Sequence, residues 1–454
     1  MPITTTLFEL FKIGPGPSSS HTLGPMRAGY DFIRSAAALP PGDLDRAARL
    51  TVHLFGSLSA TGKGHGTDRA LLAGLLGKRP DDCPSDFLDG LFSDQEASYP
   101  IQIAGKTFEV TAKSVVFDAL VHDFPHSNTL VFHLLDADGK SVFEKEYYSV
   151  GGGFIQWKGW TQPDRGVPPY PYDSMEDLKR LIRDNDISLH RLMLANEKAL
   201  TGLSEQRIFA NIDQILAAME SAVEAGLAAE GQLPGPIKLW RKGGELLRRS
   251  VQKDRIADNF LVTLSAYAFA AAEENAAGHI VVTAPTSGSS GVIPAIVKIM
   301  RTRLMLPDQN IREGLLAAAA VGFLCKQNAT IAGAEGGCQA EIGVASAMGA
   351  ALLAHACGFG VRVMENSAET ALEHHLGLTC DPVQGFVQIP CIERNAMGAV
   401  KAYTAFMIAS SEEHTRHAVG LDVTIEAMAD TGRDLSCKYK ETSQGGLAVC
   451  MKVC

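Results

Sequence analysis

Three cysteines of this sequence stand in short segments that contain glycine or proline. They are Cys338 in AGAEGGCQAEIG, Cys380 in HHLGLTCDPVQG and Cys391 in QIPCIERNAMG. These surroundings predict that each thiol lies in a loop or at a helix start, where the helix dipole lowers the pKa of an exposed thiol and favours a metal-binding thiolate. Taken singly, each could be an unrelated buried cysteine. Taken together, they are better explained as ligands.

Three thiolates match the requirements of an iron-sulfur cluster. They can bind three irons of a [4Fe-4S] cluster and leave the fourth iron open. An open iron is a Lewis acid that can bind a carboxylate and a hydroxyl and accept a hydroxide leaving group. The sequence contains no CxxC pair, which disfavours a zinc ribbon or a thioredoxin-like site.

Clustered hydroxyl groups form a second candidate site. The segment TAPTSGSSGVIPA joins two apolar stretches through a hydroxyl-rich loop. Backbone NH groups of such a loop at a helix N-terminus bind anions, and the hydroxyls add donors. The loop is predicted to bind a substrate carboxylate, with a simple capped turn as the alternative. The residues concerned are Thr286, Ser287, Gly288 and Ser289.

Two loops nearer the N-terminus carry histidines. GPSSSHTLGPMRAG is predicted to start a helix, and GSLSATGKGHGTDRA is a glycine-rich loop. The second loop does not fit a phosphate-binding loop, because Lys63 is followed by Gly rather than Ser or Thr. Nucleotide binding is therefore disfavoured. The polar candidates of the two loops are Ser18, Ser19, Ser20, His21, His65 and Thr67.

The elements that must position these residues fall into two predicted domains. Residues 1–157 alternate short β-type runs, such as Leu50–Phe55 and Thr107–Val110, with helical stretches, which indicates an α/β or α+β domain. Residues 158–173 form a proline-rich linker. Residues 174–454 begin with a capping-box-like pair, Ser174 and Asp177, and are predicted to form a mainly α-helical catalytic domain.

Helical spacing of apolar residues recurs along the second domain. It first runs from Ser174 to about Ala229. The later helical stretches are Asn259–Ala277, Asn310–Gln327, Glu341–His355, Glu393–Ser411 and Gly420–Thr431.

Charge and composition restrict the partners and the compartment. The 454 residues include 41 Lys and Arg against 51 Asp and Glu, so the formal net charge is -10. This charge repels nucleic acid and anionic membrane surfaces, and we expect neither as a partner. The N-terminus lacks the features of a secretory signal, and nine cysteines, an odd number, argue against a disulfide framework. A cytoplasmic location is expected.

Four segments together resemble the iron-sulfur-dependent L-serine dehydratases in their single-chain form. They are GGCQAEIG, TCDPVQGFVQIPCIERNAMGA, TAPTSGSSGVIPA and GPSSSHTLGPMRAG, and they lie in both domains. The resemblance implies a homodimeric lyase that converts L-serine to pyruvate and ammonia. It implies that a [4Fe-4S] cluster is held by Cys338, Cys380 and Cys391, and that the first domain resembles an allosteric substrate-binding domain.

The resemblance also implies roles for residues outside the cysteine segments. Single-chain members are thought to place a C-terminal cysteine on the fourth iron when substrate is absent. Cys454 matches that position, and Cys450 is a rival for it. His126 and Asn128 of PHSNT, with the two histidine loops, are implied to form a polar wall that meets the cluster domain. For His21 and His126, capping or loop hydrogen bonding is an equally good explanation.

Elimination of water from serine requires a base at the α-carbon and an electrophile at the hydroxyl. Histidine suits the role of base near neutral pH. His65 is the first choice, because its glycine neighbours allow close approach, and His21 is the reserve. Arg394 and Lys401 could balance the substrate carboxylate or be surface charges. A pyridoxal-phosphate enzyme could catalyse the same reaction, but the sequence has neither its phosphate loop nor its lysine context.

Two other functions remain open from the sequence. Another cluster-dependent lyase could act on a hydroxy acid or on cysteine, since iron chemistry tolerates several leaving groups. A non-catalytic serine-sensing protein is suggested by the first domain, but it would have no use for three ligand cysteines and an open iron. Substrate profiling separates the first alternative, and anaerobic iron-sulfur absorbance separates the second.

Overall fold

A mixed five-stranded sheet forms the centre of the first domain. The computed structural model describes residues 1–84, 86–94, 96–250 and 259–451. The sheet has the order β5-β2-β6-β7-β8, in which β2 pairs in parallel with β5 and the other neighbours are antiparallel. Its strands are β2 (Arg49–Leu54), β5 (Val115–Phe117), β6 (Thr129–Leu135), β7 (Ser141–Ser149) and β8 (Ile155–Trp157).

Along β2, apolar residues alternate with polar ones, and the apolar residues form the face of the sheet that packs in the core. Leu50, Val52 and Leu54 are fully buried, whereas the residues between them are partly exposed, as expected for a strand with one packed face. The helices α2 (Gly24–Ala37) and α5 (Thr67–Leu75) pack on each other beside the sheet. The hairpin of β3 (Tyr99–Ile103) and β4 (Lys106–Val110) completes this domain.

The second domain is built around helix α15 (Val344–Ala356), in which every residue except His355 is buried. Its sequence, VASAMGAALLAHA, is apolar or small on every side, as expected of a helix surrounded by other helices. It packs against α12 (Val292–Thr302), α13 (Asp308–Asn328), α16 (Val361–Glu373) and α17 (Cys391–Ser411). The outer helices are α7 (Met175–Asp184), α8 (Leu189–Thr201), α9 (Glu205–Ala228), α10 (Gly243–Ser250), α11 (Asn259–Ala276) and α18 (Leu421–Asp434).

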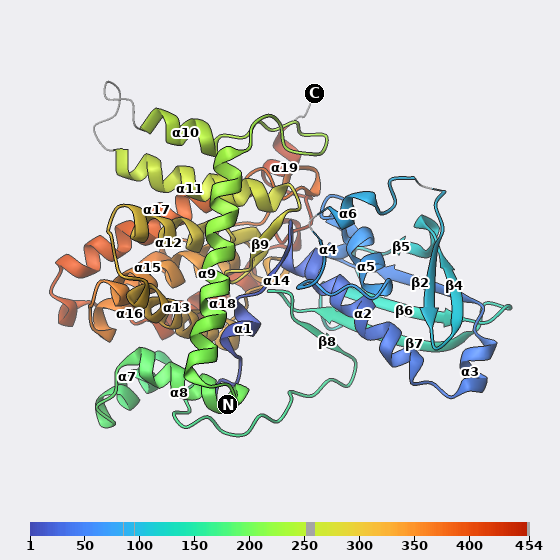
Figure 1. Cartoon of the computed structure of the whole chain (residues 1–454), viewed down its shortest axis with the longest axis horizontal. Helices are drawn as coiled ribbons and strands as arrows, with labels where there is room; N and C mark the ends of the chain where they lie inside the picture. The colour runs from blue at the N-terminus through green and yellow to red at the C-terminus, as the bar shows by residue number, and fades with distance from the viewer. Residues whose placement is uncertain (85, 95, 251–258, 452–454) are drawn as a thin grey trace.

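This architecture confirms the predicted mixed first domain and mainly helical second domain (Figure 1). The side chain of Ser174 caps α7 by accepting a hydrogen bond from the backbone NH of Asp177 at 3.1 Å. One expected helix is divided, because the stretch Glu341–His355 lies partly in a π-helical turn, η4 (Gln339–Gly343), and partly in α15. Such turns are frequent at functional sites.

The N-terminal residues pack with the second domain rather than the first. The short helix α1 (Leu7–Leu10) contributes to the core of the helical domain, and β1 (Ile13–Pro15) pairs with β9 (Ile280–Val282). The chain therefore begins on the helical domain, crosses to the sheet domain and returns. Residues 158–173, all of which are described, make this return and contain neither helix nor strand.

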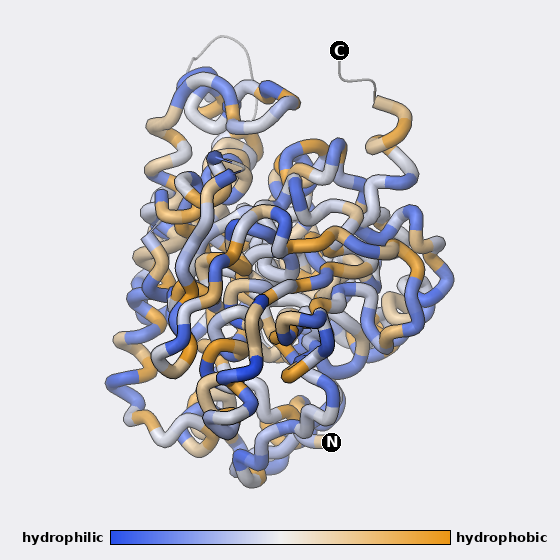
Figure 2. The backbone as a smooth tube through the Cα atoms, turned by 90° about the vertical axis from the view of Figure 1, so that its right-hand side faces the viewer, coloured by the Kyte–Doolittle hydropathy of each residue, from blue (hydrophilic) through white to orange (hydrophobic). Residues whose placement is uncertain are grey.

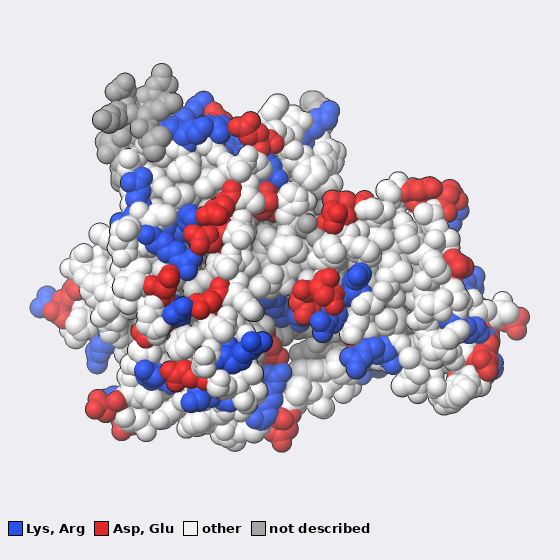
Figure 3. All heavy atoms as spheres, in the orientation of Figure 1, with Lys and Arg blue, Asp and Glu red and all other residues white. Residues whose placement is uncertain are grey.

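The surface carries both acidic and basic side chains. Figure 2 shows hydrophilic and hydrophobic stretches alternating along the outer helices, as expected when one helix face is packed and the other is solvated. On the face shown in Figure 3, acidic and basic side chains are interspersed rather than gathered into one field. Among the described residues, no helix is both long and apolar enough to cross a bilayer.

Candidate active site

The three predicted ligand cysteines share one buried region of the helical domain. Cys338 is the N-cap of η4, Cys380 lies in a loop bridged to Lys440, and Cys391 begins α17. Their exposed fractions are 3%, 3% and 8% in that order. The ligand atoms of Cys338, Cys380 and the neighbouring Glu341 lie within 4.8 Å of one another.

The three thiols differ in how readily they ionise. The hydrogen bond with Cys380, and then the positive charge of Arg394, lower the pKa of Cys338. The same hydrogen bond and burial raise the pKa of Cys380, while burial and the charge on Cys338 raise the pKa of Cys391. The expectation of three exposed thiols with lowered pKa is therefore wrong. The protein encloses the thiols and provides one guanidinium to offset their charge.

Arg394 holds the loop that carries Cys380. Its guanidinium donates hydrogen bonds to the carbonyl oxygen of Thr379 and, at 2.9 Å, to Oδ1 of Asp381. Asp381 is 3% exposed, and its other carboxylate oxygen accepts from the backbone NH of Leu447. Arg394 is thus engaged on both sides of Cys380, where it can position the loop and balance negative charge.

Lys401, the other predicted cation, has a different environment. Its ammonium donates to the carbonyl oxygen of His374, at the end of α16, at 2.7 Å. A cation at this place satisfies a carbonyl group of a helix C-terminus. The structure therefore gives Lys401 a helix-capping contact, and the geometry does not support its predicted role with the substrate.

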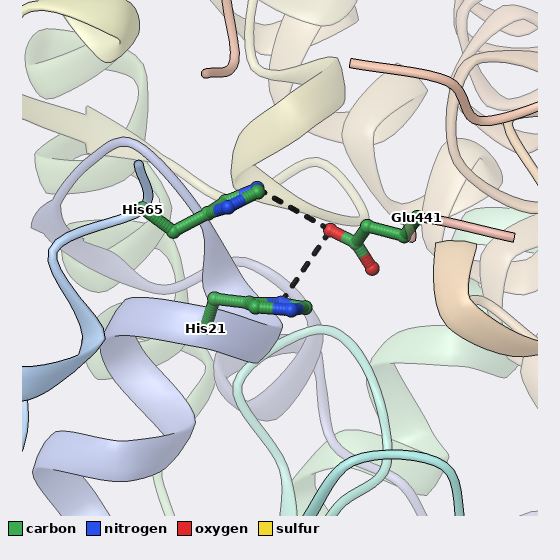
Figure 4. Close-up of side chains that lie close together, drawn as sticks. All are labelled: His21, His65 and Glu441. Atoms are coloured by element: carbon green, nitrogen blue, oxygen red, sulfur yellow. Dashed lines mark ion pairs between the residues drawn. The ribbon is translucent and has the colours of Figure 1, made fainter. Parts of the chain in front are cut away.

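His21, His65 and Glu441 form a second buried group (Figure 4). His21 lies in the π-helical turn η1 (Ser19–Leu23), and His65 follows the short helix α4 (Ser57–Thr61). The two imidazole rings stack with centroids 4.4 Å apart. Oε1 of Glu441 lies 3.5 Å from Nδ1 of His21 and 3.6 Å from Nε2 of His65.

Hydrogen bonds fix which nitrogen of each ring carries the proton. Nδ1 of His65 lies 2.8 Å from the carbonyl oxygen of Thr61, which can only accept, so Nε2 is unprotonated. The hydroxyl of Ser57 donates to the carbonyl oxygen of Glu441 and therefore accepts from Nε2 of His21 at 3.1 Å. Nδ1 of His21 is left to accept from the Ser20 hydroxyl at 2.9 Å.

Both unprotonated nitrogens therefore face the Glu441 carboxyl group. Burial lowers the pKa of His65 to about 4 and the pKa of His21 well below its usual value, so both rings are neutral at neutral pH. Burial, and then the charges of Glu341 and Cys338, raise the pKa of Glu441 well above its usual value. The carboxyl group of Glu441 therefore lies against two neutral imidazoles and not against a cation.

Glu341 joins the histidine group to the cysteine group. A Cβ atom placed on Gly333 would lie 2.5 Å from Oε2 of Glu341 and 3.4 Å from Oε2 of Glu441, so both carboxyl groups meet at this glycine. Burial and the charge on Cys338 raise the pKa of Glu341. Backbone pairing brings Glu441 to this place, because its NH donates to the carbonyl oxygen of Cys380 at 2.8 Å.

The hydroxyl-rich loop reaches the same two-part site. Thr286 precedes the 3-10 turn η3 (Ser287–Ser289), and a Cβ atom on Gly288 would lie 3.1 Å from Oε1 of Glu341. Asn395 of α17 clamps this loop by donating to the carbonyl oxygen of Gly288 and accepting from the NH of Gly291, each at 2.8 Å. Ser289 bonds to Thr286 within the loop.

Several buried polar atoms around the site lack a hydrogen-bond partner among the described residues. Burying such an atom without a partner costs about 1–3 kcal/mol, which makes each one a candidate contact for a ligand. Such atoms in predicted site residues include Oγ of Ser287, Oγ1 of Thr67, and both Oδ1 and Nδ2 of Asn128; Oγ of Ser290 and Oε2 of Glu441 are further examples.

The remaining predicted residues of the first domain connect the two domains. Nδ1 of His126 accepts from the backbone NH of Asn128, so Nε2 carries the proton that faces Oε1 of Glu335, 2.8 Å away. Glu335 belongs to α14 (Gly333–Gly336), just before Cys338. His126 therefore ties the sheet domain to the cysteine segment.

The serines of the first loop mainly support His21. Ser18 caps η1 by accepting from the backbone NH of His21, and its hydroxyl lies 3.2 Å from that of Ser20. The carbonyl oxygen of Ser20 accepts from Ser149 of β7 at 2.7 Å. Ser19 is 1% exposed. The geometry gives these serines a positioning role around the histidine pair.

The C-terminal segment is anchored beside Cys380. Leu447 begins the short helix α19 (Leu447–Cys450) and donates its backbone NH to Oδ2 of Asp381 at 2.7 Å. Cys450 is exposed. Cys454 lies outside the described residues, so its predicted contact with the fourth iron stays a prediction.

Sequence reasoning missed the two glutamates that link the parts of the site. Glu341 lies three residues after Cys338, in one of the cysteine segments. This closeness to a predicted ligand could have identified Glu341 as a site residue. Glu441 is remote from every selected motif, and only the bridge between Cys380 and Lys440 brings it into place. Asn395 was also missed, although it lies one residue after Arg394.

Comparisons with known proteins match both domains. The family model for the serine dehydratase beta chain matches residues 6–160, and that for the serine dehydratase alpha chain matches residues 184–448. An L-serine dehydratase of Streptomyces coelicolor is 42% identical, covering 98% of each chain. L-serine dehydratase TdcG of Escherichia coli is 41% identical over 97% of this chain and 98% of its own, and an L-serine dehydratase of Helicobacter pylori is 38% identical over 98% and 99%.

These matches cover nearly the whole chain at high identity, and they include both regions that build the site. The sheet domain supplies the histidines, and the helical domain supplies the cysteines and glutamates. The chain belongs to the serine dehydratase family, with the beta and alpha regions of that family joined in one polypeptide.

Proposed function

We propose that this protein is an L-serine dehydratase, a lyase that converts L-serine to pyruvate and ammonia with the help of a [4Fe-4S] cluster. The observation that carries the proposal is the contact between its two buried groups. Three cysteines lie on one side, a neutral histidine pair lies on the other, and Glu341 and Glu441 meet between them. Elimination of water needs these two functions, an electrophile and a base, on either side of one small substrate.

The residues of the cysteine group fit an iron-sulfur cluster. Thiolates are the usual ligands of such clusters, and Cys338, Cys380 and Cys391 would supply three of them. Arg394 offsets the negative charge, and the buried setting protects the site from bulk solvent. When bound, a cluster with one open iron supplies Lewis acidity at the hydroxyl group that leaves.

His65 is proposed as the base that removes the α-proton. Its Nδ1 proton is held by the carbonyl oxygen of Thr61, so Nε2 has a free lone pair facing the interior of the site. Loss of the α-proton and of the β-hydroxyl gives aminoacrylate, which tautomerises to an imine and hydrolyses to pyruvate and ammonia. Glu441, which lies beside both imidazoles, is proposed to exchange protons with them during this cycle.

The substrate carboxylate is proposed to bind at the hydroxyl-rich loop. The Ser287 hydroxyl is buried and lacks a partner within the described part of the chain, so a ligand oxygen can accept its hydrogen bond without displacing an internal one. Asn395 fixes the loop against α17. Asn128 and Thr67, also unpartnered there, are candidate contacts from the opposite domain.

A cleft of about 230 Å³ lies beside His65. His65 lies on its wall together with Gly64, Gly66, Arg69 and Phe386. The lining comes from both domains, and its size suits a substrate of serine's dimensions rather than a nucleotide. The cleft is proposed as the access route to His65.

Cys454 is proposed to occupy the open iron when substrate is absent. Leu447, seven residues earlier, is anchored to Asp381 next to Cys380. This anchor holds the last helix beside the cysteine group, which supports the terminal thiol as a candidate ligand. Serine would then have to displace it.

The test is an anaerobic reconstitution with iron and sulfide followed by assay of pyruvate formation from L-serine, D-serine and L-cysteine. We expect a four-iron protein that acts on L-serine, and a Cys380→Ala variant that loses both cluster and activity. Cys437→Ser is the matched control, because Cys437 is exposed and lies in the adjoining segment. Turnover that depends on pyridoxal phosphate, or a preference for cysteine or a hydroxy acid, would contradict the proposal.

A further inference from the structure

A second group of metal-ligating side chains lies in the helical domain, apart from the cysteines and the histidine pair. It consists of His190 near the start of α8, Glu313 in the first half of α13 and His355 at the end of α15. One ligand atom of each lies within 4.8 Å of the others. We propose that these residues form a binding site for a divalent transition-metal cation, with Zn²⁺ the favoured ion.

The distances suit a tetrahedral ion. Nδ1 of His190 lies 3.1 Å from Nε2 of His355 and 3.7 Å from Oε2 of Glu313. At a Zn-N distance of about 2.0–2.1 Å, tetrahedral ligand atoms are separated by about 3.3–3.4 Å. The two separations from Nδ1 of His190 are therefore close to those that zinc requires, and the third pair of atoms lies within 4.8 Å.

The two imidazoles are ready to act as ligands. Burial, and then the proximity of His190, lower the pKa of His355 to about 4, while burial followed by the opposing effects of Glu313 and Arg191 lowers the pKa of His190. Neutral imidazole is the form that binds zinc. One proton lies between the two facing nitrogens, and a bound cation would replace it.

Outer contacts hold the ligands in place, as they do in established zinc sites. Nε2 of His190 lies 3.3 Å from the hydroxyl of Ser188, and Oε1 of Glu313 accepts from Nε2 of Gln309 at 2.8 Å. These contacts engage the atoms that do not face the proposed cation. The side chains of His190 and Glu313 are 18% and 24% exposed, so an ion and a fourth ligand, water, can enter from solvent.

A cation at this place would connect three helices that meet in the helical domain. Helix α13 contacts both α8 and α15 (Figure 1), and α15 continues directly from the turn that begins at Cys338. An ion that binds only the folded state stabilises that state by mass action. The expected role of the site is therefore structural, supporting the helix that positions Cys338.

The test measures Zn²⁺ and Co²⁺ binding to the full chain, purified anaerobically with its cluster. The comparison is between wild type, a His190→Gln/His355→Gln variant and a His374→Gln/His414→Gln control, whose histidines are exposed. We expect wild type and control to bind one more equivalent of Zn²⁺ than the first variant, with tetrahedral ligand-field bands for Co²⁺ and a higher unfolding midpoint. Zinc bound at the cysteines or at His21 and His65 would be common to all three proteins.

A second variant separates loss of zinc binding from a folding defect. Glu313→Gln keeps the size of the side chain and the contact with Gln309, and its unfolding midpoint without metal should match wild type. Its zinc affinity should fall by at least about tenfold, since even loss of an outer-shell partner costs about 10–100-fold. Equal zinc stoichiometry and affinity in wild type and in the His190→Gln/His355→Gln variant would overturn the inference, whatever the enzyme activity of either protein.

Discussion

Nδ1 of His65 lies 2.8 Å from the carbonyl oxygen of Thr61. Because that oxygen has no proton to donate, the contact selects one tautomer and leaves Nε2 as the basic nitrogen. Nε2 faces Glu441 rather than solvent, and the side chain of His65 is 1% exposed. The backbone of α4 therefore determines where the proposed base points.

Replacing His65 by Asn removes the basic nitrogen. Turnover should fall by about 100-fold or more, in the range usual for loss of a general base, while the absorbance of the cluster stays unchanged. Steady-state assays with L-serine measure the effect, and His374→Asn, at an exposed position, is the control. Near-normal turnover of the His65 variant would transfer the role to His21, for which His21→Asn is the parallel test.

Replacing Glu441 by Gln keeps the shape of a protonated carboxyl group but prevents proton exchange. Since Glu441 lies beside both imidazoles and is proposed to exchange protons with them, kcat should fall by about tenfold or more with a smaller change in KM. The pH dependence of kcat should lose one ionisation. Glu413→Gln, at an exposed carboxylate, is the control. An unchanged pH profile would show that Glu441 takes no part in proton transfer.

Two serines of the same loop should respond differently to substitution by alanine. Ser287→Ala removes a hydroxyl without an internal partner in the described structure, so folding stability should hold while KM for L-serine rises about tenfold or more. Ser289→Ala removes contacts with Thr286 and Ala284 and should lower the unfolding midpoint instead. KM for L-serine and the unfolding midpoint are measured for both variants. If the two substitutions change both quantities equally, Ser287 does not contact the substrate.

Two cysteine variants distinguish the ligands proposed for the open iron. If Cys454 competes with serine, Cys454→Ala should lower KM for L-serine and make the cluster more sensitive to oxygen, because the iron stays open. Cys450→Ala, at an exposed thiol, should resemble wild type. The reverse pattern would assign the role to Cys450, and no effect of either change would exclude an internal thiol ligand.

His417 should make stability depend on pH. Burial lowers its pKa, but the hydrogen bond with Glu369 and the charges of Glu369 and Glu412 outweigh burial, so the pKa in the folded state is raised above 6.5. A raised pKa contributes stability that is complete below the unfolded-state pKa and is lost as pH rises through the folded-state pKa. The difference in unfolding free energy between wild type and His417→Gln should therefore be larger at about pH 6 than at about pH 9.

Urea unfolding at the two pH values measures this difference. His414→Gln is the matched control, since His414 lies in the same segment and is exposed. A difference between wild type and His417→Gln that is the same at both pH values would show that the charge on His417 does not contribute.

Local patterns predicted much of the fold and some of the site. Strand β2 and helices α13 and α17 each bury one face. The apolar residues of that face recur at a fixed spacing along the sequence, so local sequence predicts these elements. The hydroxyl and cysteine motifs could also be recognised locally, because Ser287 and Cys338 lie in short segments of unusual composition. The pairing of His21 with His65 could only be suggested, because it depends on how two loops meet.

Long-range contacts escaped prediction. Glu441 reaches the histidines because its backbone pairs with Cys380, and no residue around Glu441 indicates this. Likewise Lys401 follows Cys391 on the same helix, yet its side chain reaches His374 on α16. The N-terminal segment was predicted in the first domain, but Leu7 and Leu10 pack in the core of the helical domain, and β1, which follows them, pairs with β9. Such outcomes are set by tertiary packing.

The most direct test of the central claim is Mössbauer spectroscopy on protein reconstituted with ⁵⁷Fe, recorded before and after addition of L-serine. A [4Fe-4S] cluster with three cysteine ligands should show one iron of the four changing its environment when serine binds, and three that do not change. The Cys380→Ala variant should not form the cluster. A spectrum without a four-iron cluster, or a cluster whose four irons are all indifferent to serine, would contradict the account.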